Sequence, residues 1–214
     1  IDDAHGMSWM GQRGQGFVLS QIELHPRMVV STSLGKAFGS IGGVLVCNNP
    51  ELKQIVKSCR SAFIFSSPLP PSVIGTSIAA AEIHLSPEIQ ALQASLESRI
   101  ELFRRTAQSL HLPLIGQADT PIFFIPSGNP STCFKIVQRM LQKGYYQSSA
   151  VFPSVPFNNA GVRFTLTNWL QPEDIKQMLQ CFSKERSRVL QSENLTESSI
   201  KKHFKGIDYH LNVH

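Results

Sequence analysis

A long amphipathic helix predicted near the middle of the chain separates two parts of the sequence with different patterns. Ser86-Pro87-Glu88 has the form of a helix start, with serine as the N-cap and proline at the first helical position. Apolar residues then recur at spacings of three, four and seven, at positions 89, 92, 96, 100, 103 and 110. Because long single helices often join two domains, we expect residues 86–111 to link two domains.

The part before this helix reads as short buried strands alternating with helices. Strands are predicted at residues 27–32, 42–47 and 62–65, and helices at residues 50–60 and 70–83. Residues 1–5 read like the end of a further strand, because polar functional residues often lie just past the carboxyl ends of parallel strands. The pattern predicts an α/β fold, and because the apolar residues that should precede Asp2 are missing, we expect the sequence to be part of a larger protein.

The part after the helix predicts a small α+β domain at residues 112–184. Its strands are predicted at residues 121–125, 145–152 and 162–167, and its helices at residues 130–143 and 172–182. Residues 185–214 form a polar, basic tail, which we interpret as a frayed helix or a surface arm.

Composition excludes several classes of function. The chain has 214 residues, a charged fraction of 16% and a net charge of +5, which predict a folded globular protein. No apolar run approaches the ~20 residues of a membrane-spanning helix, and no secretory signal is seen at the start. Nucleic-acid binding would rest only on a pI of about 9.2 and the basic tail, so we expect none. Four scattered cysteines without metal-ligand spacing predict no metal site and a reducing, cytoplasmic compartment.

Five side chains together indicate one kind of chemistry. Lys36 follows an apolar strand and has small neighbours, and a partly desolvated lysine can lose its proton and form a Schiff base with an aldehyde. Asp2, at a strand end, can hold a pyridinium proton, and Ser33 can place a hydroxyl on a phosphate. With His5 and the strand residue Arg163, this set favours pyridoxal phosphate chemistry.

Four ordered motifs resemble those of the α-oxoamine synthase family, which are pyridoxal-phosphate enzymes of the aspartate-aminotransferase-like fold, fold type I. They are D-D-A-H-G with the glycines at 11, 14 and 16, T-S-L-G-K-A-F-G at residues 32–39, F-S-S-P-L-P-P at residues 65–71, and the late stretches at residues 152–156 and 162–167. The resemblance runs from residue 1 to about residue 182. It implies a C-terminal half: residues 1–85 as the last part of the large cofactor domain, with its mixed, mostly parallel sheet, followed by the small α+β domain.

The resemblance also implies a role for each matching residue. Asp2 would pair with the pyridine nitrogen of pyridoxal 5'-phosphate, and Ser33 would bind the phosphate. His5 would contact the phenolic oxygen and would either assist proton transfer or polarise a thioester. Lys36 would hold the cofactor and later act as the base at the α-carbon of the amino acid.

Two further parts of the resemblance concern partners. Ser66 and Ser67 would reach the phosphate of a neighbouring subunit, which implies a homodimer with shared active sites. Arg163 would bind the substrate carboxylate, for which a planar guanidinium is better suited than an ammonium group.

The implied reaction joins an amino acid to an acyl-CoA or another acyl thioester, usually with loss of carbon dioxide, to give an α-amino ketone. The motifs are most similar to the 8-amino-7-oxononanoate synthase branch, with the glycine C-acetyltransferase and serine palmitoyltransferase branches left open. One departure is Gly161, which stands where the family's R-x-R pattern has its first arginine. The alternatives are a class I/II aminotransferase of the same fold and a non-catalytic fragment that lacks the N-terminal half.

Overall fold

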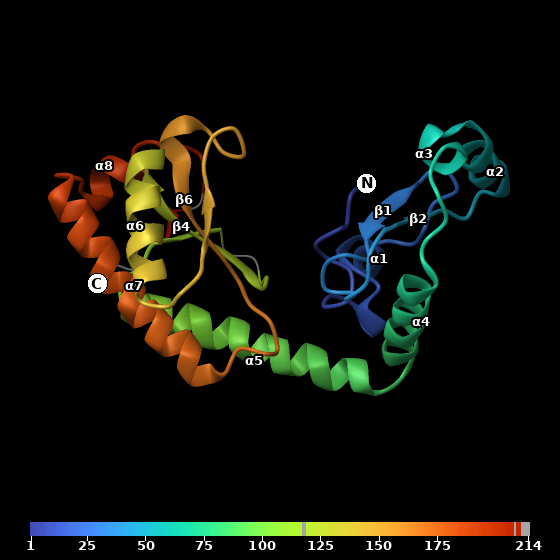
Figure 1. The fold of residues 1–214 in the computed structure, drawn as a ribbon, viewed down its shortest axis with the longest axis horizontal. Coiled ribbons are helices and arrows are strands. Elements are labelled where there is room, and N and C mark those ends of the chain that lie inside the picture. The colour runs from blue at the N-terminus through green and yellow to red at the C-terminus, as the bar shows by residue number, and fades with distance from the viewer. Residues whose placement is uncertain (117–118, 208, 211–214) are drawn as a thin grey trace. The chain divides into compact units, whose positions relative to one another are not determined.

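The computed structural model describes residues 1–116, 119–207 and 209–210. Its contacts divide the chain into two compact units, Ile1–Ala94 and Ser95–His214, and each unit is described by itself (Figure 1). The boundary falls within helix α5 (Glu88–Ser109), the helix predicted as a link. The finer domain limits given above remain a prediction. No helix of the described residues is both long and apolar enough to cross a membrane.

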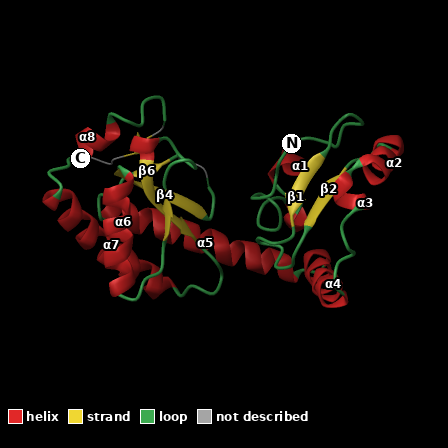
Figure 2. Cartoon of the chain, turned by 45° about the horizontal axis from the view of Figure 1, so that its top comes forward, coloured by secondary structure: helices red, strands yellow, loops and turns green. Residues whose placement is uncertain are grey.

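The first unit contains two strands and several short helices (Figure 2). Its elements are η1 (Gln12–Gly14), α1 (Phe17–Gln21), β1 (Val30–Ser33), β2 (Gly43–Val46), α2 (Pro50–Cys59), α3 (Ser61–Ile64) and α4 (Pro71–Leu85). Strands β1 and β2 pair in antiparallel fashion, and Asp2 forms a parallel bridge with Ser31 on β1. Helix α2 begins as the sequence indicates, because the Asn49 side chain accepts a hydrogen bond from the Leu52 N–H at 3.1 Å and proline follows it.

The strand predicted at residues 62–65 is wrong, because the structure has helix α3 there. Arg60 is extended and ends α2, and the chain then turns into a new helix at Ser61. The Phe65 N–H donates to the Ser61 carbonyl at 2.8 Å, so the backbone is satisfied locally. A short apolar run is compatible with a strand or a helix. Among the described strands, none pairs with residues 62–65, so the segment lacks the partner that a strand needs.

The second unit packs α-helices against a three-stranded sheet. After α5 come β3 (Leu114–Ile115), β4 (Ile122–Gly128), α6 (Pro130–Gln142), β5 (Ser148–Ala150), η2 (Phe157–Asn159), β6 (Ala160–Thr165), α7 (Pro172–Ser192), α8 (Glu197–Lys201) and β7 (Tyr209–His210). The sheet is antiparallel with the order β4-β6-β5, and β3 pairs separately with β7. As at α2, an Asn-Pro pair begins α6: the Asn129 side chain accepts from the Thr132 N–H at 3.0 Å.

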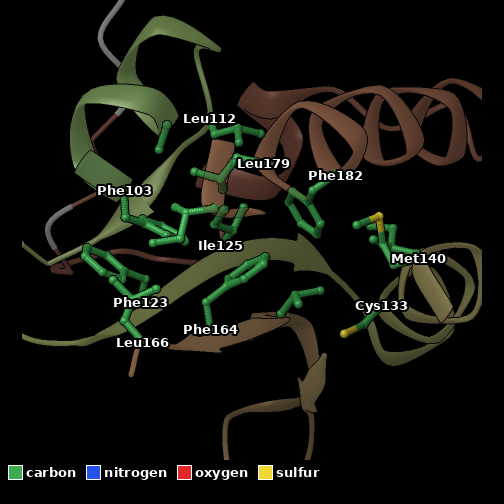
Figure 3. Close-up of a cluster of buried hydrophobic side chains, with 14 of the residues drawn as sticks. Phe103, Leu112, Phe123, Ile125, Cys133, Met140, Phe164, Leu166, Leu179 and Phe182 are labelled. Carbon is green, nitrogen blue, oxygen red and sulfur yellow. The ribbon is translucent and has the colours of Figure 1, made fainter. Parts of the chain in front are cut away.

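A large apolar core lies between the helices and the sheet of the second unit (Figure 3). The ring of Phe103 on α5 stacks on Phe123 with centroids 4.1 Å apart, and Phe182 on α7 meets Phe164 edge to face at 5.0 Å. These four aromatic side chains are at most 5% exposed. Since successive side chains of a strand point to opposite faces, burial of Phe164 against the helices places its neighbour Arg163 on the other face of the sheet.

The predicted surface arm is a folded part of the second unit. Helix α7 runs to Ser192, ten residues beyond its predicted end. Residues 193–210, here called the C-terminal segment, bury Ile200, Phe204 and Tyr209, which form a second apolar cluster with Leu190. The expectation of a frayed or surface arm is therefore wrong. These apolar residues are widely spaced among polar ones, so no helical periodicity reveals them.

Candidate active site

The acidic end of the first segment lies beside β1. The Asp3 N–H donates to the Ser31 carbonyl at 2.8 Å, and the Ser31 N–H donates to the Ile1 carbonyl at 2.8 Å. The two segments are parallel at this bridge, so their carboxyl ends lie at the same edge. The Asp2 carboxylate is exposed there, and one of its oxygens accepts from the Ala4 N–H at 2.8 Å.

The turn between β1 and β2 carries the predicted lysine. Ser33 ends β1, and its hydroxyl accepts from the Gly35 N–H at 3.2 Å. The turn is closed by the Leu34 N–H, which donates to Gly42, and by the Ser40 N–H, which donates to Leu34. Lys36 is exposed in this turn, and within the described part of the chain its ammonium group has no hydrogen-bond or ion-pair partner. The lysine is thus held on a fixed backbone with its amine available.

Helix α4 anchors this lysine turn. The Ser40 hydroxyl lies 2.8 Å from the Ser77 hydroxyl and donates to the Val73 carbonyl at 3.3 Å. The ring of Phe38 packs against the His84 ring, with centroids 4.9 Å apart. These contacts come from residues on both sides of Gly39, which has a φ of +80°. They restrict the backbone around Lys36 and so give its amine a defined starting position, which favours reaction with a bound group.

The structure adds one residue that sequence reasoning missed, the buried Asp3. Its carboxylate accepts from the Val18 N–H at 3.0 Å and lies between Gly6 and Gly16. A Cβ atom on either glycine would come within 2.3 Å of an Asp3 oxygen, so neither position admits a side chain. The sequence signal for this buried carboxylate is an aspartate followed by the spaced glycines Gly6 and Gly16. Asp3 fixes the glycine-rich loop, and the neighbouring Asp2 remains exposed for a ligand.

The remaining predicted residues lie in different parts of the chain. His5 is exposed one turn after Asp2, and its carbonyl accepts from the Trp9 indole N–H. Ser66 and Ser67 are exposed after α3, and the Ser66 hydroxyl donates to the Ala62 carbonyl. The structure therefore brings Asp2, Ser33 and the lysine turn to one edge, and it shows no contact of the two later serines with them.

Arg163 belongs to the second unit, on the central strand β6. It pairs in register with Phe124 on one side and Ser148 on the other. The residue is half-buried, and among the described residues its guanidinium has no hydrogen-bond or ion-pair partner. An arginine in this state can receive a carboxylate. No group of three or more metal-ligating side chains is found among the described residues.

This combination of a parallel strand edge with an acid and a glycine-flanked lysine defines a class of α/β cofactor enzymes. The family model for aminotransferase class I and II matches residues 1–182, and the chain belongs to that family. The 8-amino-7-oxononanoate synthase of Serratia proteamaculans is 32% identical over 180 residues, which are 84% of this chain and 45% of that protein. The chain spans about half the length of the curated relatives it matches.

Solved structures agree on the fold. A serine palmitoyltransferase from S. paucimobilis with a bound PLP–myriocin aldimine gives a TM-score of 0.80 at 22% identity, over 88% of this chain and 47% of that one. An 8-amino-7-oxononanoate synthase from Francisella tularensis gives 0.76 at 22% identity, over 91% of this chain and 55% of that one. The expected fold, part of a fold type I transferase, is confirmed.

Proposed function

We propose that this chain carries part of the active site of a pyridoxal-phosphate-dependent C-acyltransferase, which condenses an amino acid with an acyl-CoA or other acyl thioester. Loss of carbon dioxide would then give an α-amino ketone. The observation that carries the proposal is the edge where Asp2, Ser33 and the unpaired Lys36 emerge from neighbouring parallel segments. The similarity to 8-amino-7-oxononanoate synthases supports the choice of reaction.

The donor set of this edge fits pyridoxal 5'-phosphate. It offers a carboxylate for the pyridine nitrogen, an amine for the aldehyde and a hydroxyl for the phosphate, at Asp2, Lys36 and Ser33. When bound, the cofactor would supply the electron sink that makes the α-carbon of an amino acid acidic. Lys36 would bind the cofactor and then move the α-proton, and His5 would assist that transfer. Arg163 would hold the substrate carboxylate by a charge-assisted hydrogen bond.

We also propose a homodimer in the cytoplasm, in which Ser66 and Ser67 serve the phosphate of the neighbouring subunit. Both serines are exposed, so they are available to a second subunit. The four cysteines are all free thiols, as a reducing compartment would keep them.

Reduction with borohydride in the presence of pyridoxal phosphate tests this proposal directly. We expect one covalent cofactor adduct that maps to Lys36 by peptide mass spectrometry and disappears in Lys36→Ala. Lys53→Ala is the matched control, because Lys53 is an exposed lysine on α2. The Lys36 adduct should be unchanged in this variant. An adduct that persists in Lys36→Ala would contradict the lysine assignment.

An aminotransferase is the second candidate, favoured by the description of the family model. The two activities differ in their products. Release of free thiol from an acyl-CoA, dependent on the amino acid, supports the acyltransferase. Stoichiometric conversion of the cofactor to its pyridoxamine form, without thiol release, supports the aminotransferase.

A further inference from the structure

The sheet face that carries Arg163 has a glycine and an aromatic residue beside the arginine. Gly161 lies two residues before Arg163 on β6, so both point to the same face. Phe124 on β4 and Ser148 on β5 pair in register with Arg163 from opposite sides, so both also point to that face. This group of Phe124, Ser148, Gly161 and Arg163 is called the Arg163 face below.

The ring of Phe124 occupies the space over Gly161. A Cβ atom built on Gly161 would lie 2.4 Å from Phe124 Cζ, 2.5 Å from Phe124 Cε1 and 2.6 Å from the Ile125 carbonyl oxygen. No side chain fits there, because the Ile125 backbone oxygen would block it even if the ring moved. The position two residues before Arg163 is thus filled from the neighbouring strand by an aromatic ring, and a cation cannot stand there.

The C-terminal segment holds this ring in place. The ring of Phe204 packs on Phe124 with centroids 6.3 Å apart, and Tyr209 packs on Phe204 at 5.8 Å. Leu195 and Ile200 belong to the same cluster. This whole segment lies beyond residue 182, where the family match ends. The ring is therefore backed by a part of the chain that the family model does not include.

We propose that Phe124 is a specificity-determining residue, which restricts the Arg163 site to ligands with a single carboxylate next to an aliphatic chain. This inference rests on the proposed role of Arg163 in binding a substrate carboxylate. One unpaired guanidinium can neutralise one carboxylate. On the β4 side of Arg163, a second carboxylate would meet Phe124, whose ring face carries partial negative charge and which offers no hydrogen-bond donor. On the β5 side it would meet the neutral hydroxyl of Ser148, which cannot neutralise a second negative charge. An aliphatic chain gains by covering the same ring.

Titration of the full chain with hexanoate and adipate tests the proposal. These two acids have six carbons each and differ in the second carboxylate. We expect hexanoate to bind about tenfold more tightly than adipate, followed by NMR of the Arg163 side chain at constant ionic strength. Arg163→Gln should abolish binding of both acids. Adipate binding equal to or tighter than hexanoate binding would overturn the proposal, and so would the absence of saturable binding by either acid.

Two variants of Phe124 separate the chemical effect of its ring from an effect on folding. Phe124→Leu keeps an apolar wall and should keep the preference for hexanoate. Phe124→Lys removes the ring and places a second cation beside Arg163 without adding a side chain at Gly161, so the preference should reverse toward adipate. An unchanged preference in Phe124→Lys would overturn the proposal. The Lys36 adduct is measured without these acids, so failure of the proposed function and failure of this inference give different results.

Discussion

Removal of the Glu197 carboxylate is expected to open the C-terminal segment. Glu197 accepts two hydrogen bonds from Arg186, whose side chain is 4% exposed, and one from the Tyr209 hydroxyl at 2.8 Å. Glu197→Ala leaves the buried guanidinium with only the Pro126 carbonyl, at 2.9 and 3.1 Å. Breaking a buried pair costs several kcal/mol, and because the Glu197 side chain is 34% exposed we expect about 2–3 kcal/mol. The open population then rises about 30- to 160-fold.

Limited trypsin digestion measures this opening. Lys201, Lys202 and Lys205 are exposed in the C-terminal segment, and cleavage there follows the open population when closing is fast. Peptide mass spectrometry should show cleavage at these lysines accelerated by the factor above. The control Glu193→Ala removes a partly exposed ion pair with Lys135 and should change stability by less than about 1 kcal/mol. A Glu197→Ala rate no higher than that of this control would refute the reasoning.

Three further expectations follow from burial and charge. Phe182→Ala should lower the free energy of unfolding of the second unit by about 3–5 kcal/mol in urea titrations, whereas Phe134→Ala, at a side chain 52% exposed, should cost much less. Burial raises the pKa of Glu197, but hydrogen bonding and charge from Arg186 outweigh this and leave the pKa below its usual 4.5. The stability it contributes is therefore present above about pH 4.5 and lost as the pH falls through the lowered value, which urea titrations at several pH values would show and Glu197→Ala would lack. Asp3→Ala should speed amide hydrogen exchange at Val18, since that N–H loses a charged acceptor worth about 1.5–3 kcal/mol; unchanged exchange would contradict this hydrogen bond.

Local signals made part of the fold predictable. The pairs Asn49-Pro50 and Asn129-Pro130 predict helix starts. The asparagine side chain accepts a hydrogen bond from a backbone N–H of the first turn, and the proline ring fixes a helical φ there. The long helix α5 also follows its apolar spacing, from Glu88 to Ser109. The pairing of Asp2 beside β1 agrees with its interpretation as a strand end.

What could not be predicted depends on contacts between distant residues. The burial of Asp3 needs Val18, fifteen residues away, to supply its donor. The ring of Phe124 reaches its place only because Gly161 leaves room and Phe204 returns from the end of the chain. Sequence spacing relates only residues that are near one another in the chain. It therefore shows that Gly161 replaces an arginine, but not that the Phe124 ring occupies the space over Gly161.

The edges of the sheet in the second unit also bear on how the protein avoids association through its strands. Strand β5 has only three residues, Ser148–Ala150, which offer few backbone groups to an incoming strand, and Pro153 follows soon after. On the opposite edge, Pro126 in β4 has no N–H to donate, and its carbonyl is already taken by Arg186. Short strands and prolines at edges are features that oppose the growth of a sheet from one molecule into the next. The Arg186 guanidinium, which binds Glu197 in the C-terminal segment, thus also occupies a backbone acceptor at this edge of the sheet.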